Sequence, residues 1–84
     1  MKFYFITFRS ITFAQRAEGV LRRNGFICVL QRTPRWMEER GCGYCLKLRQ
    51  GSVRAAISTL RENGLSFSKI YMQHGEDQAE ELVL

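Results

Sequence analysis

The residues most able to do chemistry in this chain are two cysteines in the segment Gly41-Cys42-Gly43-Tyr44-Cys45. Basic side chains surround them in the sequence, namely Arg35, Arg40, Lys47 and Arg49. Nearby positive charge lowers the pKa of a thiol and so favours the thiolate, which is its nucleophilic form. Gly41 and Gly43 remove side-chain bulk and permit backbone angles that other residues avoid. The segment therefore predicts an exposed, activated sulfur on a loop.

Cys42 and Cys45 could also act together. In an extended strand, their spacing would separate the two Cα atoms by about 10 Å. A disulfide needs about 7 Å or less, so the pair closes only if Gly43 bends the chain. Three further interpretations stay open: a Cys42/Cys45 redox pair, a zinc site shared between two chains, and a Cys42 that only fits a tight turn. One chain offers too few ligands for a structural zinc site, so we expect no resident metal or cofactor.

Length and composition limit the classes of protein to which this chain can belong. Eighty-four residues make one small domain, and no apolar run reaches the length of a membrane span. An odd number of cysteines, two of them close together, is no framework for a disulfide-rich secreted domain. We therefore expect a cytoplasmic protein that has no membrane contact.

The charge is unevenly distributed along the chain. The net charge is +5, with 13 basic and eight acidic residues. Residues 76–84 hold four of the acids and no base, which leaves +9 on residues 1–75. Such a surface attracts anions, and nucleic acid is one candidate. Since the strand beginning at Tyr44 lacks the aromatic pattern of an RNA recognition motif, nucleic acid is not the partner we expect first. A basic nucleic-acid-binding domain stays open as an alternative.

The elements expected around the cysteines alternate between strands and helices. Residues 3–8, 26–30, 44–48 and 67–72 have the composition of strands. One helix follows the capping box formed by Thr12 and Gln15, with Ser10 as a rival N-cap, and Ser52 caps the other. Leu21-Arg22-Arg23-Asn24-Gly25 and Leu60-Arg61-Glu62-Asn63-Gly64 match at four of five positions, so each predicts a helix end.

This order predicts an α+β, ferredoxin-like split βαβ fold of the form βαββαβ. It has a four-stranded antiparallel sheet with both helices on one face. We assign residues 1–75 to this domain and residues 76–84 to an acidic C-terminal tail, for which no partner element is expected. In the strand at 44–48, Tyr44, Leu46 and Leu48 should share one face, and Cys45 and Lys47 the other. Cys28 should be a small core residue.

The chain also resembles a known family of small bacterial proteins, the selenium/sulfur carrier-like proteins. The resemblance runs from about Phe3 to Tyr71, and its specific part is Thr33-Pro34-Arg35 followed closely by Gly41-Cys42-Gly43 at the start of a strand. It implies that Cys42 is the carrier thiol, which holds sulfur or selenium as a persulfide or selenosulfide. Arg35 would be the matching basic residue of the family motif.

The residues and the resemblance together predict a carrier or binding module rather than an enzyme. Cys42 is the expected reactive thiol and Cys45 a candidate resolving thiol. Arg35, Arg40, Gly41 and Gly43 would form the surrounding binding site. The expected partners are proteins that donate and accept the sulfur or selenium, and the sheet edges would allow a homodimer.

Overall fold

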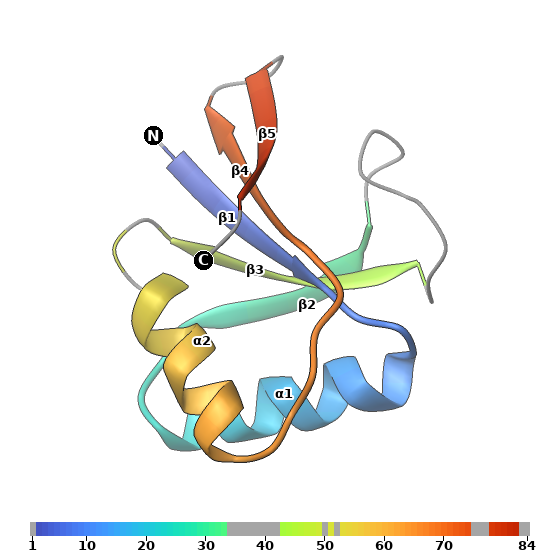
Figure 1. The fold of residues 1–84 in the computed structure, drawn as a ribbon, viewed down its shortest axis with the longest axis vertical. Helices are drawn as coiled ribbons and strands as arrows, with labels where there is room; N and C mark the ends of the chain where they lie inside the picture. The colour runs from blue at the N-terminus through green and yellow to red at the C-terminus, as the bar shows by residue number, and fades with distance from the viewer. Residues whose placement is uncertain (1, 34–42, 50, 52, 75–77, 83–84) are drawn as a thin grey trace.

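A computed structural model describes residues 2–33, 43–49, 51, 53–74 and 78–82 of the chain. Its elements are β1 (Lys2–Thr7), α1 (Ile11–Arg23), β2 (Cys28–Arg32), β3 (Tyr44–Arg49), α2 (Val53–Glu62), β4 (Ile70–His74) and β5 (Gln78–Leu82). The strands form one antiparallel sheet in the order β2-β3-β1-β4-β5. Both helices cover the same face of this sheet (Figure 1).

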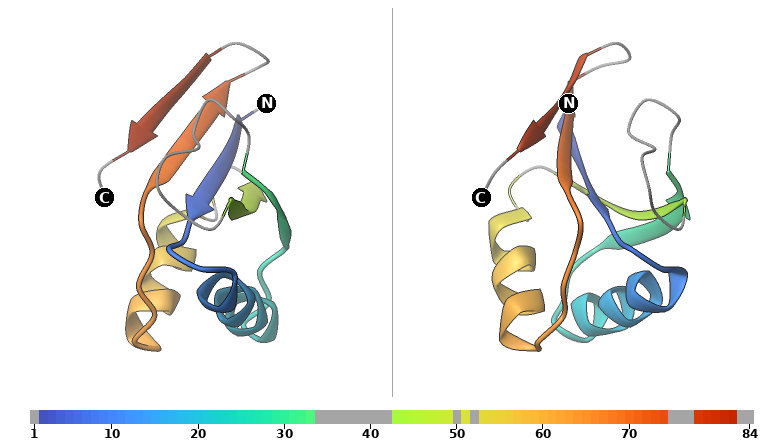
Figure 2. Two further views of the ribbon diagram at one scale, coloured as in Figure 1. Left: turned by 90° about the vertical axis from the view of Figure 1, so that its right-hand side faces the viewer. Right: turned by 45° about the vertical axis from the view of Figure 1, so that its right-hand side comes forward.

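The sheet has one strand more than the sequence predicted. The α+β class, the two helices and the order βαββαβ over the first four strands agree with the prediction. The expectation that the residues after His74 have no partner element is wrong for residues 78–82. They form β5, which pairs with β4 from Ile70↔Leu82 to His74↔Gln78 and lies at the edge of the sheet (Figure 2).

The two repeated sequences end the two helices in the same way. Gly25 and Gly64 have φ values of 85° and 71°, a left-handed conformation that suits glycine. The main-chain N–H groups of Phe26 and Leu65 donate to the carbonyls of Leu21 and Leu60, at 3.0 and 2.9 Å. These are the bonds of a Schellman cap. The shared sequence therefore corresponds to a shared local structure.

The start of α1 decides between the two predicted caps. The hydroxyl of Ser10 accepts a hydrogen bond from the N–H of Phe13, so Ser10 is the N-cap, and the capping box at Thr12 is wrong. Thr12 is instead an exposed residue inside the helix. Ser52, predicted to cap α2, lies outside the described residues.

Two strands begin later than predicted, for a local reason. The N–H of Phe26 caps α1 and cannot join the sheet, so β2 begins at Cys28. Before β4, the main chain of Ser68 and Lys69 bonds to Thr7, and the regular ladder starts only at Ile70. In both cases the first residues after the helix cap stay outside the regular strand.

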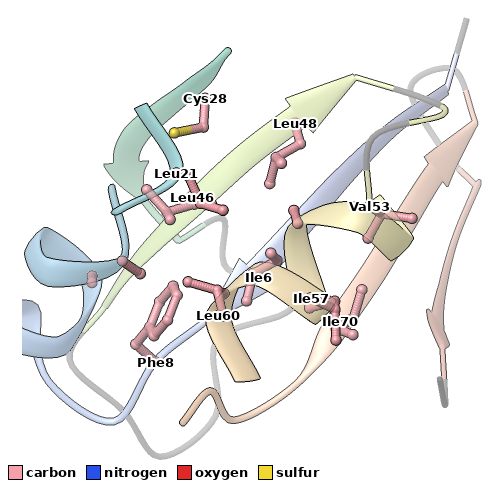
Figure 3. Packing of buried hydrophobic residues seen from close by; sticks show 13 residues of the cluster. Ile6, Phe8, Leu21, Cys28, Leu46, Leu48, Val53, Ile57, Leu60 and Ile70 are labelled. Carbon is pink, nitrogen blue, oxygen red and sulfur yellow. The ribbon is translucent and has the colours of Figure 1, made fainter. Parts of the chain in front are cut away.

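The main core lies between the sheet and the helices. The apolar residues spaced at the helical period are buried, namely Val53, Ala56, Ile57 and Leu60 of α2 and Ala17, Val20 and Leu21 of α1, while Phe13 packs against the core partly buried. Figure 3 shows this cluster. Its buried members are Ile6, Phe8, Ala14, Ala17, Leu21, Cys28, Leu46, Leu48, Val53, Ala56, Ile57, Leu60 and Ile70. Neither helix in the described part of the chain is long and apolar enough to cross a membrane.

Candidate functional site

Strands β2 and β3 form a hairpin and flank, in the sequence, the segment that contains Cys42. The last ladder pair of the hairpin is Arg32↔Tyr44. Beyond it, the N–H of Thr33 donates a 2.7 Å hydrogen bond to the carbonyl oxygen of Gly43. The hairpin is therefore hydrogen-bonded up to the residue that follows Cys42 in the chain. Of the predicted site residues, Arg35, Arg40, Gly41 and Cys42 lie outside the described residues, whereas Gly43 and Cys45 are described.

Gly43 has a φ of 76°, in the region that glycine adopts without strain. A Cβ built on it would meet no atom within 4 Å, so space does not explain the glycine. The backbone conformation explains it, because a side chain there would be strained. The chain therefore departs from an extended path between Cys42 and Cys45, where the sequence argument required a bend.

Cys45 lies on the sheet face opposite the helices. The predicted alternation is confirmed, because Leu46 and Leu48 belong to the core beneath the helices and Cys45 does not. Cys45 forms a second cluster with Phe5 of β1 and Tyr71 of β4, which we call the opposite-face cluster. The exposed fractions of these three residues are 0 %, 2 % and 7 %. The thiol of Cys45 is therefore closed to solvent in this structure.

The neighbours of Cys45 were not predicted from the sequence. Cys45 pairs with Thr7 across the β1–β3 ladder, which places Phe5 beside it on the same face. Phe5 in turn pairs with Tyr71 of β4. The signal in the sequence was the alternation of β1, where Tyr4 and Ile6 face the helices and Phe3 and Phe5 face the other way. Only the strand order shows that Phe5, on this face of β1, packs against Cys45.

Two cations close to the hairpin contact aromatic rings. The Nζ of Lys47 lies 4.1 Å from the ring centre of Phe3 and 5.9 Å from that of Phe5. The guanidinium of Arg32 lies 5.5 Å from the ring centre of Tyr44. For each of the two cations, the shortest distance to a ring centre lies within the range of cation–π attraction. Of the four cations predicted around the cysteines, Lys47 contacts these rings and Arg49 is the last residue of β3, while Arg35 and Arg40 lie outside the described residues.

Cys28 is a core residue, as predicted. Burial raises the pKa of its thiol, and the nearby Arg22 offsets part of this effect by favouring the thiolate. An Arg22 Nη donates to the carbonyl oxygen of Cys28 at 3.1 Å. Cys28 belongs to the helix-side core and Cys45 to the opposite-face cluster, so the sheet separates these two thiols. A raised pKa and a buried position both disfavour reaction at Cys28.

The geometry bears on the metal and nucleic-acid alternatives. Within the described ranges, no three His, Cys, Asp or Glu side chains come together in a way that could hold a metal ion. Base stacking needs exposed rings. Phe5 and Tyr71 are buried, so the face opposite the helices does not present them for stacking.

Comparison with known proteins gives the family of the chain. No curated protein and no solved structure matches it. A family model described as "Putative Se/S carrier protein-like" matches residues 3–72, which spans every described element except β5, the first residue of β1 and the end of β4. The chain therefore belongs to the Se/S carrier protein-like family.

Proposed function

We propose that the protein is a thiol carrier that holds sulfur or selenium on Cys42. The chain belongs to the Se/S carrier protein-like family. The observation that carries the proposal is that the other two thiols, those of Cys28 and Cys45, are buried. Cys28 is enclosed by the helix-side core and Cys45 by the opposite-face cluster. By elimination, Cys42 is the thiol left to meet a donor. It precedes Gly43, where the hydrogen-bonded hairpin ends.

The transfer needs no external oxidant. The Cys42 thiolate attacks the outer sulfur of a donor persulfide, and the bond between the two donor sulfurs breaks. The donor leaves as a thiolate that takes the bonding electron pair, and Cys42 becomes the persulfide. An acceptor nucleophile then removes the outer sulfur and returns Cys42 to the thiolate. Selenium follows the same steps, with a selenosulfide on Cys42.

The cations assigned to this chemistry are Arg35 and Arg40, which would stabilise the thiolate. Gly41 and Gly43 would give the donor access to the sulfur, and the φ of Gly43 supports this role. The protein would act as a carrier between a donor and an acceptor rather than as an enzyme. Its site includes no resident cofactor in this proposal.

A second candidate is a redox role for Cys42 and Cys45, and one observation favours it. The positive φ of Gly43 turns the chain between the two cysteines, as closure of a disulfide would require. Against it, the thiol of Cys45 is enclosed by Phe5 and Tyr71. Cys45 would therefore act as a resolving thiol only after the opposite-face cluster opens.

Intact mass of the full chain, purified without reductant and measured again after reduction, separates these candidates. The carrier predicts a reducible gain of one sulfur or selenium atom, located on the peptide that contains Cys42. The Cys42→Ser variant should lose this gain, and the Cys28→Ser variant should keep it. A loss of two hydrogens linking Cys42 to Cys45 would instead support the redox pair, and zinc bound in stoichiometric amount would support a metal site.

A further inference from the structure

A groove of about 350 Å³ lies between one side of α1 and the turn that follows α2. It is formed on the helix side of the molecule and includes no cysteine. Arg16, Gly19, Val20 and Arg23 of α1 line it together with Asn63 and Leu65. We call it the α1–α2 groove. Its volume is in the range of sites that hold small molecules or peptide side chains.

The α1–α2 groove is positively charged without a compensating acid. None of its lining residues is acidic. Arg16 and Arg23 are exposed, and neither has an ion pair with any residue in the described part of the chain. Arg22, on the adjoining side of α1, differs because it pairs with Glu18 at 3.3 Å. The groove therefore presents two available guanidinium groups to an anionic partner.

Gly19 lets Arg23 reach into the groove. A Cβ built on Gly19 would lie 3.4 Å from an Nη of Arg23, so the guanidinium extends back along the helix to the position of Gly19. Arg16 is one turn away from Gly19. The two arginines therefore line the same side of α1, and the missing side chain of Gly19 leaves room for the guanidinium of Arg23.

The rest of the lining is the exposed Gln15, two apolar side chains and Asn63. Val20 and Leu65 supply aliphatic surface that is mostly buried. The side-chain amide of Asn63 donates to the carbonyl of Thr59 at 2.8 Å, which fixes its orientation. Leu65 is fixed by the cap bond to Leu60. The groove is therefore formed before any partner binds, which reduces the entropy cost of binding.

We propose that the α1–α2 groove docks an acidic peptide segment of a partner protein that also carries an apolar side chain. Carboxylates suit the two arginines, because guanidinium and carboxylate pair through two parallel hydrogen bonds. An aliphatic side chain of the same segment covers Val20 and Leu65. Single-stranded nucleic acid fits less well, since its sites use aromatic rings and no ring lines this groove.

The test uses the full chain and a fluorescently labelled synthetic peptide in which glutamates flank a leucine. Its control is the same peptide with glutamine in place of glutamate. Fluorescence anisotropy measures binding at low and at physiological salt. We expect the glutamate peptide to bind and the glutamine peptide to bind at least about tenfold more weakly, because the charge pairing is lost. Binding should weaken as salt rises.

Three variants locate the binding site. Arg23→Glu should weaken binding about tenfold, since it replaces attraction with repulsion. Gly19→Leu keeps the charge and fills the groove, so it should weaken binding as well. Arg54→Glu is the matched control, because Arg54 is an exposed residue of α2 outside the groove, and it should change the affinity by less than about twofold.

Several results would overturn the proposal. Equal losses for Arg23→Glu and Arg54→Glu would mean that the peptide senses net charge only. Unchanged binding by Gly19→Leu would remove the groove from the interaction. Displacement of the peptide by single-stranded RNA at lower concentration than by unlabelled peptide would favour nucleic acid. The Cys42→Ser variant should bind the peptide normally, so the docking and carrier proposals can fail separately.

Discussion

The N–H of Thr33 and the carbonyl oxygen of Gly43 are joined by a 2.7 Å hydrogen bond across ten residues of sequence. The bond continues the β2–β3 ladder one step beyond Arg32↔Tyr44. It forms while Gly43 holds a φ of 76°. The end of the hairpin therefore depends on a residue that tolerates this angle, and that residue is next to the proposed carrier thiol.

Replacing Gly43 tests this dependence. Gly43→Ala should lower the free energy of unfolding by about 1–2 kcal/mol, because a residue with a Cβ is strained in the left-handed region. Urea unfolding measures the change. Gly19→Ala is the control, since Gly19 lies inside α1, where alanine should raise stability by about 0.5–1 kcal/mol. Equal effects of the two substitutions would contradict a conformational role for Gly43.

The enclosed thiols should be protected from alkylation. With iodoacetamide at neutral pH, Cys28 and Cys45 should react at least about 100-fold more slowly in the native protein than in denaturant, because each reacts only after local opening. Peptide mass spectrometry follows each cysteine separately. A Cys45 that labels equally fast in both conditions would show that the opposite-face cluster does not enclose it.

The two faces of the sheet should respond independently to loss of packing. Phe5→Leu loosens the cluster around Cys45 and should speed labelling of Cys45 more than of Cys28. Phe8→Leu loosens the helix-side core and should do the reverse. The same ratio of rates in both variants would mean that the thiols become accessible through one global opening.

Stability at alkaline pH should depend on Cys28. Burial raises the pKa of its thiol in the folded state, so folding favours the protonated form. This contribution is fully present below the pKa of the thiol in the unfolded chain, and it is lost as the pH rises towards the folded pKa. The urea midpoint should therefore fall less between neutral pH and pH about 10 in Cys28→Ala than in the parent chain. An identical fall in both proteins would rule this linkage out.

The fifth strand should be held more by packing than by charge. Leu82 packs partly buried against the core, and Leu82→Ala should cost about 1–2 kcal/mol of unfolding free energy. The Lys69–Glu81 pair is 3.6 Å long and substantially exposed, so Glu81→Ala should cost less than about 1 kcal/mol. Thermal unfolding should show a larger loss of stability for Leu82→Ala than for Glu81→Ala. A larger loss for Glu81→Ala would contradict this account.

The features predicted correctly are those that a short stretch of sequence determines. Each Leu-Arg-x-Asn-Gly end requires only a glycine after a helix and an apolar residue beyond it, and both caps form as predicted. The apolar stripes of α1 and α2 follow the helical period and are mostly buried. The alternation of β3 likewise places Cys45 and Leu46 on different faces.

The cap proposed at Thr12 and the first residues of β2 and β4 were local errors. The other errors concern pairings between distant residues. Gln78-Ala79-Glu80-Glu81-Leu82 has little of the composition of a strand, so its acids indicated a solvated tail. Its strand conformation comes from pairing with β4, which a local pattern does not reveal. The contacts of Cys45 with Phe5 and Tyr71 depend in the same way on strand order. Of the site itself, the sequence identified the thiols and predicted the burial of Cys28, but it did not predict that Cys45 would be enclosed.

The placement of β5 also separates unlike charges across the sheet. Its exposed Glu80 and Glu81 lie at one edge of the sheet, and the exposed Arg32 lies in β2 at the other, about 19 Å away across four strand spacings. A net charge alone attracts an anionic protein from every direction, whereas a dipole also turns the approaching molecule. The acids of β5 would therefore disfavour the approach of an anionic protein to this edge, and the β2 edge carries no such acids among the described residues.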